Sequence, residues 1–390
     1  MSVSRRHFMG GVAAALGYLG VGPQDDLFAQ QPGAAAPRAR AAAAVDDWDS
    51  FAHLSSNENC WGPPDSVMKA MNSAWKYSNR YGYPDGNLVG EIAKHHGLKP
   101  ENILLGAGSG EILDVVATTF LLDGKKVLGV EPTYSSVYQH ATSIKTSAIK
   151  LPLTKDYRQD MNAFIKTANA RANEIGLVYL CNPNNPTGLI VTKEEVKQLL
   201  DGIPKGMPVL IDEAYHHFVD DPRYATSVPY VIEGRPVIIA RTFSKIAALA
   251  GMRLGYAVAP AEMIQKMRPF SIASINALVK WGGVASLKDT ASQAEVKAKT
   301  IALRKKTTSE LEAYGYPTIP SDTNFFMVSI GREIQPVIDE FRAKKVMVGR
   351  PFPPMTTHMR VSVGTAEEME RFRKAFKEIF PAKTRNTAAI

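Results

Sequence analysis

The fold is constrained most by short, uninterrupted apolar runs that alternate along the chain with helical patterns. The strands predicted in this way lie at 103–105, 126–130, 177–180, 209–211, 237–240 and 254–258. Continuous apolar runs of this length are typical of strands that are covered on both faces of a sheet. Strands that alternate with helices favour parallel crossovers. The sequence therefore predicts an α/β protein with a mostly parallel central sheet covered by helices.

A second, smaller unit is predicted towards the C-terminus. Residues 291–314 are rich in Lys, Glu and Ala and predict a long helix that could link two domains. Further strands are expected at 324–328, 346–348 and 359–363, with helices at 334–344 and 366–379. We therefore predict a large domain at 76–290, a small α+β domain formed by 45–75 and 291–382, and a tail at 383–390.

The first 44 residues belong to a different kind of sequence. The pair Arg5-Arg6 precedes a Gly/Ala-rich apolar run at 10–22, and a segment rich in Ala, Pro and Gln follows. Paired arginines before a short apolar run predict a twin-arginine export signal with a linker. The run is shorter than the roughly 20 residues that a membrane span needs. We expect a periplasmic protein that meets the membrane only in transit, or a cytoplasmic one if the arginine pair is accidental.

Composition and charge exclude several classes of protein. The chain has 46 Lys and Arg against 38 Asp and Glu, and these charges are scattered. Nucleic-acid binding is not expected, because such proteins usually carry a basic stripe with interleaved aromatic residues. The two cysteines, Cys60 and Cys181, cannot build a disulfide framework.

Polar segments directly follow the predicted strands. They are 106–110, 182–188, 212–215 and 241–245. Each one alone is typical of a turn, a helix cap or an ion pair. Ligands of parallel sheets bind beyond the carboxyl ends of the strands, and the sheet would bring these segments to one edge. Their combination therefore predicts a binding site there.

These segments, in this order and with Arg253, resemble those of fold-type I pyridoxal-phosphate aminotransferases of class I/II. The chain is most similar to histidinol-phosphate aminotransferases, and the resemblance extends from residues 57–59 to residues 360–365. It implies a homodimer with active sites at the subunit interface. The implied reaction moves the amino group of an α-amino acid or a histidinol-phosphate-like amine to a 2-oxo acid such as 2-oxoglutarate.

The resemblance assigns the groups around the cofactor's ring. Lys245 matches the lysine that holds the cofactor's aldehyde as a Schiff base and moves the proton of the reaction. Asp212 matches the carboxylate that keeps the ring nitrogen protonated. Asn185 and Tyr215 match residues that hydrogen-bond the ring's 3-oxygen, and Tyr134 matches the aromatic residue stacked on the ring. The catalytic residues implied are Lys245, Asp212 and Tyr215.

The cofactor's phosphate is expected at the start of a helix, because helix N-termini favour anions. The residues implied to bind it are Gly108, Ser109, Thr242, Ser244 and Arg253. Tyr83 resembles a tyrosine that reaches the phosphate from the neighbouring subunit. Tyr81 stands two residues before it and is the alternative.

The substrate side is assigned by the same resemblance. Arg360 matches the arginine that binds the substrate's α-carboxylate, a group that suits the guanidinium fork. Arg350 lies near a second arginine that contacts the distal phosphate in histidinol-phosphate enzymes, although the stretch between the two arginines is shorter here. Asn57 and Asn324 lie in segments that line the substrate side.

Alternative functions remain open from the sequence. Gly106 and Gly108 between a strand and a helix imitate a dinucleotide fingerprint, which would suit an NAD oxidoreductase, but Glu111 stands where that motif has Gly or Ala. A pyridoxal-phosphate decarboxylase or lyase on the same fold is the stronger alternative, and a binding protein without activity is a third. No metal site is predicted, and His216 and His217 are expected to be structural.

Overall fold

The computed structural model describes residues 45–272 and 274–383, and the predicted export segment 1–44 lies outside these residues. The chain divides into a unit of residues 1–49, in which α3 (Val45–Trp48) is described, and a unit of residues 50–390 that holds all the elements below. No helix in the described ranges is long and apolar enough to cross a membrane.

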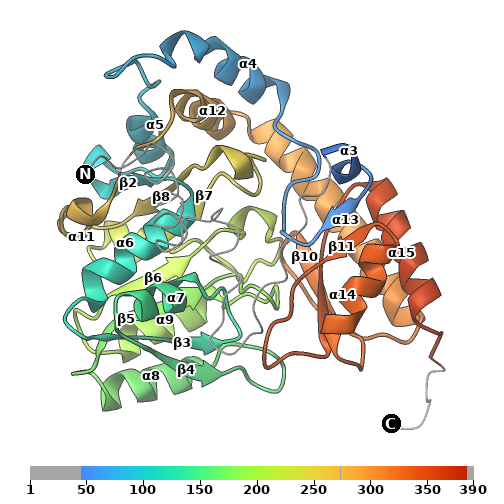
Figure 1. The fold of residues 1–390 in the computed structure, drawn as a ribbon. Coiled ribbons are helices and arrows are strands. Elements are labelled where there is room, and N and C mark those ends of the chain that lie inside the picture. Colours follow the sequence, from blue (N-terminus) through green and yellow to red (C-terminus); the bar gives the residue numbers. More distant parts are fainter. Residues whose placement is uncertain (1–44, 273, 384–390) are drawn as a thin grey trace, which may run out of the picture. The chain divides into compact units, whose positions relative to one another are not determined.

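A seven-stranded sheet forms the centre of the larger region (Figure 1). Its strands are β2 (Ile103–Gly106), β3 (Lys126–Glu131), β4 (Ala148–Pro152), β5 (Ile175–Cys181), β6 (Val209–Asp212), β7 (Val237–Thr242) and β8 (Gly255–Val258). The strand order is β2-β8-β7-β6-β5-β3-β4, and β8 runs antiparallel to both of its neighbours. The predicted α/β class with a mostly parallel sheet is confirmed.

Both faces of this sheet are covered by helices, as the continuous apolar runs require. In β6, Val209 and Ile211 belong to one hydrophobic core and Leu210 to the other, because successive side chains alternate across a strand. The first core also takes residues from α5 (Leu88–His95), α8 (Met161–Ala170), α9 (Lys193–Gly202), α10 (Val228–Ile232) and α12 (Ala277–Lys288). The second takes residues from α6 (Ser109–Leu121), α7 (Ser136–Ser143) and α11 (Ala261–Met267).

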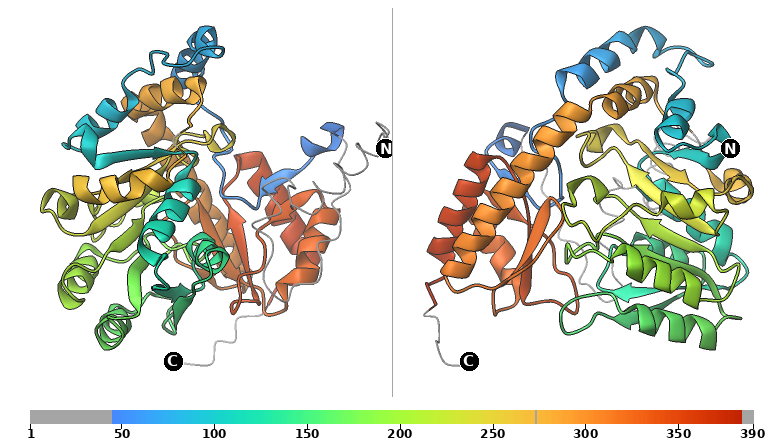
Figure 2. Two further views of the ribbon diagram at one scale, coloured as in Figure 1. Left: turned by 60° about the vertical axis from the view of Figure 1, so that its left-hand side comes forward. Right: turned by 180° about the vertical axis from the view of Figure 1, so that it is seen from behind.

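The smaller region has its own core and two small sheets. One sheet has the order β12-β10-β9, and the other pairs β1 with β11. Their bounds are β1 (Ala52–Leu54), β9 (Thr318–Ile319), β10 (Phe325–Ser329), β11 (Val346–Val348) and β12 (His358–Ser362). The helices are α13 (Thr290–Ala313), α14 (Ile334–Ala343) and α15 (Ala366–Ile379), and the long α13 runs beside α15 (Figure 2). Phe326, Phe341, Phe372 and Phe376 fill the core.

The early segment 51–74 contributes to both regions. β1 pairs in parallel with β11, while α4 (Asp65–Ser73) packs against α12, where Gly282 lies close to Met71. Short 3₁₀ helices complete the described structure: η1 (Trp75–Tyr77), η2 (Pro100–Asn102), η3 (His216–Phe218), η4 (Ala250–Met252) and η5 (Arg268–Phe270). Residues 55–64, between β1 and α4, therefore connect the smaller region to the larger one.

Candidate active site

The carboxyl ends of three neighbouring strands bring the predicted polar segments together. β5 pairs with β6 and β6 with β7, and Asp212 at the end of β6 lies in register with Cys181 and Ala240. The loop with Asn185 follows β5, and the loop with Lys245 follows β7. Residues that are far apart in the sequence therefore meet at one edge of the sheet.

A chain of hydrogen bonds joins this edge to the smaller region. Arg360, on β12, donates from Nη1 to Asn185 Oδ1 at 2.7 Å. Asn185 Nδ2 lies 3.4 Å from the Tyr215 hydroxyl, and Asn57 Nδ2 donates to the same hydroxyl at 3.0 Å. Asn324 Nδ2 donates to the carbonyl oxygen of Asn57 at 2.9 Å. The structure thus connects five of the predicted residues through direct contacts.

Asp212 is a buried carboxylate with an exposed fraction of 3%. Its Oδ1 accepts a hydrogen bond from the Ala214 amide at 3.1 Å, and the Tyr179 hydroxyl lies 3.5 Å from Oδ2. Burial raises the pKa of Asp212 to about 6, because the charged form loses its hydration. A cation placed against this carboxylate would stabilise it.

Lys245 is a half-buried amine beside Tyr215. Its Nζ donates to the Ser56 carbonyl oxygen at 3.2 Å and lies 5.7 Å from the centre of the Tyr215 ring. Burial, together with the positive charges of Arg360 and Arg253, lowers the pKa of Lys245 to about 8. An amine with this pKa is partly unprotonated near neutral pH, so it can act as a nucleophile and a base.

The start of α6 forms a second polar corner with Arg253. Gly108 precedes the helix with φ +82°, a conformation that favours glycine, and Ser109 is the first residue of α6. Arg253 Nη2 donates to the Ala107 carbonyl oxygen at 3.1 Å, and a Cβ on Gly108 would lie only 2.1 Å from that nitrogen. The guanidinium and the helix start therefore share one cradle that suits an anion.

The remaining predicted cofactor ligands lie around this cradle and the sheet edge. Thr242 Oγ1 donates to Ser244 Oγ at 2.9 Å and accepts from the Ser244 amide at 3.0 Å. Tyr134 follows β3, and burial raises the pKa of its hydroxyl to about 12. The charge of Asp212 also raises this pKa, and that of Arg253 lowers it. Tyr134 therefore lies within electrostatic reach of both ends of the site.

Arg360, the arginine predicted to bind the substrate's carboxylate, is buried with an exposed fraction of 7%. Besides Asn185, it donates to the Ser55 carbonyl oxygen, and its buried Nε has no hydrogen-bond partner among the described residues. Burial, together with the nearby charge of Arg350, lowers the pKa of Arg360 to about 10. Asn324 Oδ1 is likewise buried and has no partner in the described part of the chain.

Tyr83 makes its contacts within its own chain. Its hydroxyl donates to the Ile275 carbonyl oxygen at 2.8 Å, and its ring stacks on Tyr77 with 6.4 Å between ring centroids. Tyr81 is fully exposed. The predicted reach of Tyr83 to a neighbouring subunit stays a prediction.

Some residues of the site were not predicted from the sequence. Ser362 Oγ accepts from the Asn57 amide at 2.8 Å and donates to Asn57 Oδ1 at 2.9 Å, so it fixes the side chain that binds Tyr215. Phe352 lies against Arg360, and the Ser56 carbonyl binds Lys245. Ser362 lies two residues after Arg360 on β12, and this spacing was the one signal that could have identified it, because alternate strand residues share a face.

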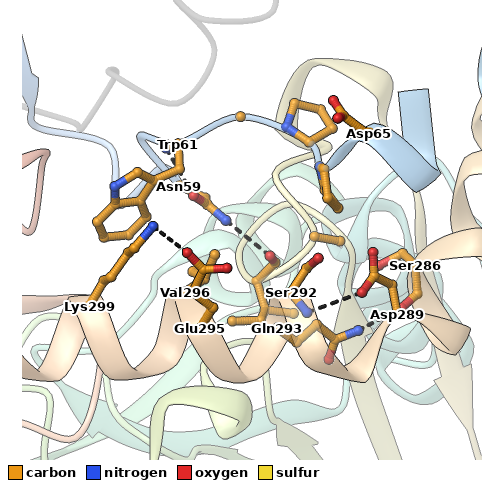
Figure 3. A pocket seen from close by; sticks show the side chains of 15 residues that line it. Asn59, Trp61, Asp65, Ser286, Asp289, Ser292, Gln293, Glu295, Val296 and Lys299 are labelled. Atoms are coloured by element: carbon orange, nitrogen blue, oxygen red, sulfur yellow. Dashed lines mark hydrogen bonds and ion pairs between the residues drawn. The ribbon is translucent and has the colours of Figure 1, made fainter. Parts of the chain in front are cut away.

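A cavity of about 250 Å³ lies next to the loop that carries Lys245 (Figure 3). Asn59 lines it and donates from Nδ2 to the Ile246 carbonyl oxygen at 3.0 Å. Trp61 and the ion pair of Lys299 with Glu295 also line this cavity (Figure 3). Asn59 thereby ties the early segment to the residue that directly follows Lys245.

The histidines near the site are bound to protein groups. His216 Nε2 lies 2.6 Å from Arg241 Nη1, and Arg241 forms a buried ion pair with Glu213 at 2.6 Å. Within the described ranges no group of three or more His, Cys, Asp or Glu side chains could hold a metal ion.

Comparisons with known proteins give the same class as this geometry. Residues 50–376 match the family described as aminotransferase class I and II, and the chain belongs to this family. It is 36% identical over 337 residues to the histidinol-phosphate aminotransferase of Moorella thermoacetica, covering 84% of each chain. It is 33% identical over 339 residues to that of Caldicellulosiruptor saccharolyticus, covering 84% of this chain and 91% of that one.

A solved structure agrees. The histidinol-phosphate aminotransferase of Sinorhizobium meliloti in complex with pyridoxal-5'-phosphate matches with a TM-score of 0.77 and 25% identity, over 84% of this chain and 90% of that one. The protein is a pyridoxal-phosphate-dependent aminotransferase of fold type I, a transaminase that acts on small molecules. The alternatives drawn from the sequence, including a decarboxylase or lyase, are not favoured.

Proposed function

We propose that this aminotransferase takes the amino group of an α-amino acid or a histidinol-phosphate-like amine and passes it to a 2-oxo acid such as 2-oxoglutarate. The observation that carries the proposal is the contact chain of Lys245, Tyr215, Asn185 and Arg360. It joins an amine of lowered pKa to an arginine whose Nε has no hydrogen-bond partner among the described residues. The names of the relatives, histidinol-phosphate aminotransferases, support the choice of donor.

The residues fit pyridoxal phosphate at both ends of the site. The buried carboxylate of Asp212 would bind a protonated ring nitrogen. This positive charge would offset the lost hydration that raises the pKa of Asp212. The start of α6, with Gly108, Ser109 and Arg253, would hold the phosphate. Asn185 and Tyr215 would bind the ring oxygen. Bound there, the cofactor supplies a ring that withdraws electrons from the donor's α-carbon.

Lys245 would hold the cofactor and move the reaction's proton. Its pKa of about 8 lets Nζ accept a proton from the donor's α-carbon and release it again near neutral pH. Tyr215 limits where Nζ can lie, because its ring is 5.7 Å away and its hydroxyl is fixed by Asn57 and Asn185. Tyr215 would thereby orient the Lys245 amine.

The substrate's anionic groups would bind Arg360 and Arg350. Arg360 Nε is buried and has no partner among the described residues, and a carboxylate or phosphate oxygen would satisfy it. Arg350 acts electrostatically on Arg360, so both charges would face the same ligand. Asn57 and Asn324 would line the same side through the Asn324 hydrogen bond to Asn57.

The test is the visible absorption of purified protein and of Lys245→Ala, each titrated with a panel of amino acids and histidinol phosphate. We expect a yellow wild type that one donor bleaches and a keto acid restores, while Lys245→Ala shows neither change. A wild type that stays colourless with added cofactor would contradict the proposed site. Release of CO₂ or ammonia without transfer would contradict transamination.

We also propose that the protein is exported in folded form with its cofactor and works in the periplasm. The support is Arg5-Arg6 before the apolar run in residues 1–44, which lie outside the described residues. Cell fractionation should find cleaved protein in the periplasm, and replacing both arginines by lysine should retain it in the cytoplasm. Uncleaved wild type found only in the cytoplasm would disprove export.

A further inference from the structure

Two arginines of the substrate side lie against the ring of Phe352. The guanidinium carbon of Arg350 is 4.4 Å from the ring centroid, and that of Arg360 is 4.7 Å from it. Phe352 itself is buried, with an exposed fraction of 3%. Two like charges therefore share one aromatic neighbour.

This arrangement has an electrostatic cost that the ring reduces. The burial of Arg360 and the charge of Arg350 both lower the pKa of Arg360, so each disfavours its charged form. The negative face of an aromatic ring attracts a nearby cation, and the attraction grows when the cation loses water. An aliphatic side chain in place of Phe352 would fill the space without this attraction.

The donors of the two arginines are only partly used within the chain. Arg350 Nη1 donates to the Pro351 carbonyl oxygen at 2.9 Å, and Arg360 donates to Asn185 and Ser55. Arg360 Nε has no partner among the described residues. A ligand with several anionic oxygens could bind donors of both arginines at once.

We propose that Phe352 is a positioning residue that holds Arg350 beside Arg360, so that the pair binds a doubly charged anionic group of the substrate. This inference rests on the proposed function, because it assigns the group to the substrate side of that site. Phe352 acts through the arginines and does not take part in the reaction. The shared chemistry is a dianion, which a phosphate or a dicarboxylate could supply.

The experiment compares wild type with Phe352→Leu, Phe352→Tyr, Arg350→Ala and the double variant Arg350→Ala/Phe352→Leu, all loaded with cofactor. Calorimetric titrations with inorganic phosphate, malonate and acetate measure the binding of two dianions and one monoanion. We expect Phe352→Leu to weaken phosphate binding about tenfold and acetate binding much less, because Arg350 would no longer be held beside Arg360. Phe352→Tyr keeps a ring and should bind phosphate nearly as wild type does.

The double variant tests whether Phe352 acts through Arg350. In the Arg350→Ala background, Phe352→Leu should cause little further loss of phosphate affinity, because coupled residues are not additive. In turnover with histidinol phosphate, Phe352→Leu should raise KM more than it lowers kcat. If Phe352→Leu weakens malonate binding more than phosphate binding, the substrate's dianion is a dicarboxylate. If it weakens phosphate binding more, the dianion is a phosphate.

Equal losses for dianions and acetate would overturn the inference, as would an undiminished effect of Phe352→Leu in the Arg350→Ala background. Thermal unfolding and cofactor absorbance show whether each variant is folded, and Phe352→Met replaces Phe352→Leu if the latter is not. A wild type that transfers no amino group refutes the proposed function, whereas an active wild type whose phosphate affinity ignores Phe352 refutes only this inference.

Discussion

Lys245 illustrates how a single residue acquires its chemistry from its surroundings. A lysine in water has an ordinary pKa, but burial beside Tyr215 and the positive charges of Arg360 and Arg253 lower the pKa of Lys245 to about 8. The ordinary value is about 10.4, so near neutral pH the unprotonated fraction is about two hundred times larger than for an ordinary lysine. The neutral amine is the form that reacts with an aldehyde.

We predict that cofactor uptake by the cofactor-free protein accelerates with pH and levels off above about pH 8, because Lys245 then is mostly unprotonated. Below that pH the rate should rise about tenfold per pH unit. Rapid-mixing absorbance of the cofactor at several pH values measures it. A rate that keeps rising to pH 10 would show that the amine has its ordinary pKa.

Gly108 is the second residue whose surroundings decide its effect. A Cβ there would lie 2.1 Å from Arg253 Nη2, and its φ of +82° disfavours any side chain. We predict that Gly108→Ala weakens cofactor binding at least about tenfold by displacing Arg253 from the start of α6. Equilibrium titration with the cofactor measures this.

Gly110 provides the matched control in the same helix start. A methyl group added to its α-carbon would have no neighbouring atom within 4 Å, so Gly110→Ala should leave cofactor affinity unchanged. Equal losses in the two variants would show that the cradle of Gly108 and Arg253 does not bind the phosphate.

At the scale of elements, the ends of β6 and β7 are held together by buried charges. Glu213 follows β6, Arg241 lies on β7, and their ion pair at 2.6 Å is almost completely buried. Arg241 also lies 2.6 Å from His216 Nε2. Because arginine only donates hydrogen bonds, this nitrogen must accept, and His216 cannot take a second proton without losing the contact.

This contact predicts loss of stability in acid. Burial and Arg241 lower the pKa of His216, and also those of His95, His96 and His217. The unfolded chain therefore binds more protons below about pH 6.5, and the stability that is complete above this pH is lost as pH falls. For one such histidine the free energy of unfolding should fall by about 1.4 kcal/mol per pH unit.

Urea unfolding at pH 7, 6 and 5 measures this slope. His216→Gln offers an amide oxygen to Arg241 and cannot be protonated, so the slope should become smaller. An unfolding free energy that does not change between pH 7 and pH 5, or an equal slope in the variant, would disprove the role of His216.

Elements and site differ in how far the sequence predicts them. The apolar runs located β5, β6 and β7 closely, and residues at their ends meet as predicted because parallel strands end at one edge. The antiparallel direction of β8 was not predicted, since an apolar run does not state its direction. Ser362 could have been identified from its spacing to Arg360 on β12, whereas Phe352 could not, because its contact with Arg360 depends on the path of the segment between β11 and β12.

At the scale of the whole molecule, the homodimer that the family resemblance implies would place Tyr83 of each chain at the neighbouring chain's site. We predict that mixing Lys245→Ala with Tyr83→Phe restores activity, because a mixed dimer has one site with Lys245 from one chain and Tyr83 from the other. With random exchange of subunits about a quarter of all sites should be intact. Activity assays before and after subunit exchange measure the recovery.

Tyr81 gives the control for this experiment. If Tyr81 rather than Tyr83 reaches the neighbouring cofactor, Tyr81→Phe should be the variant that complements Lys245→Ala, and its full exposure leaves it available for such a contact. No recovery with either tyrosine variant would mean that both groups act within their own chain.

The hydrogen bond from Arg360 to Asn185 has a consequence for how the enzyme fails. It joins β12 of the smaller region to the loop that follows β5 of the larger sheet. A substrate that needs both groups can be turned over only while the two separately packed cores stay aligned. Catalytic activity measured in rising denaturant therefore reports how well the two regions stay aligned, and it should be lost before either core unfolds.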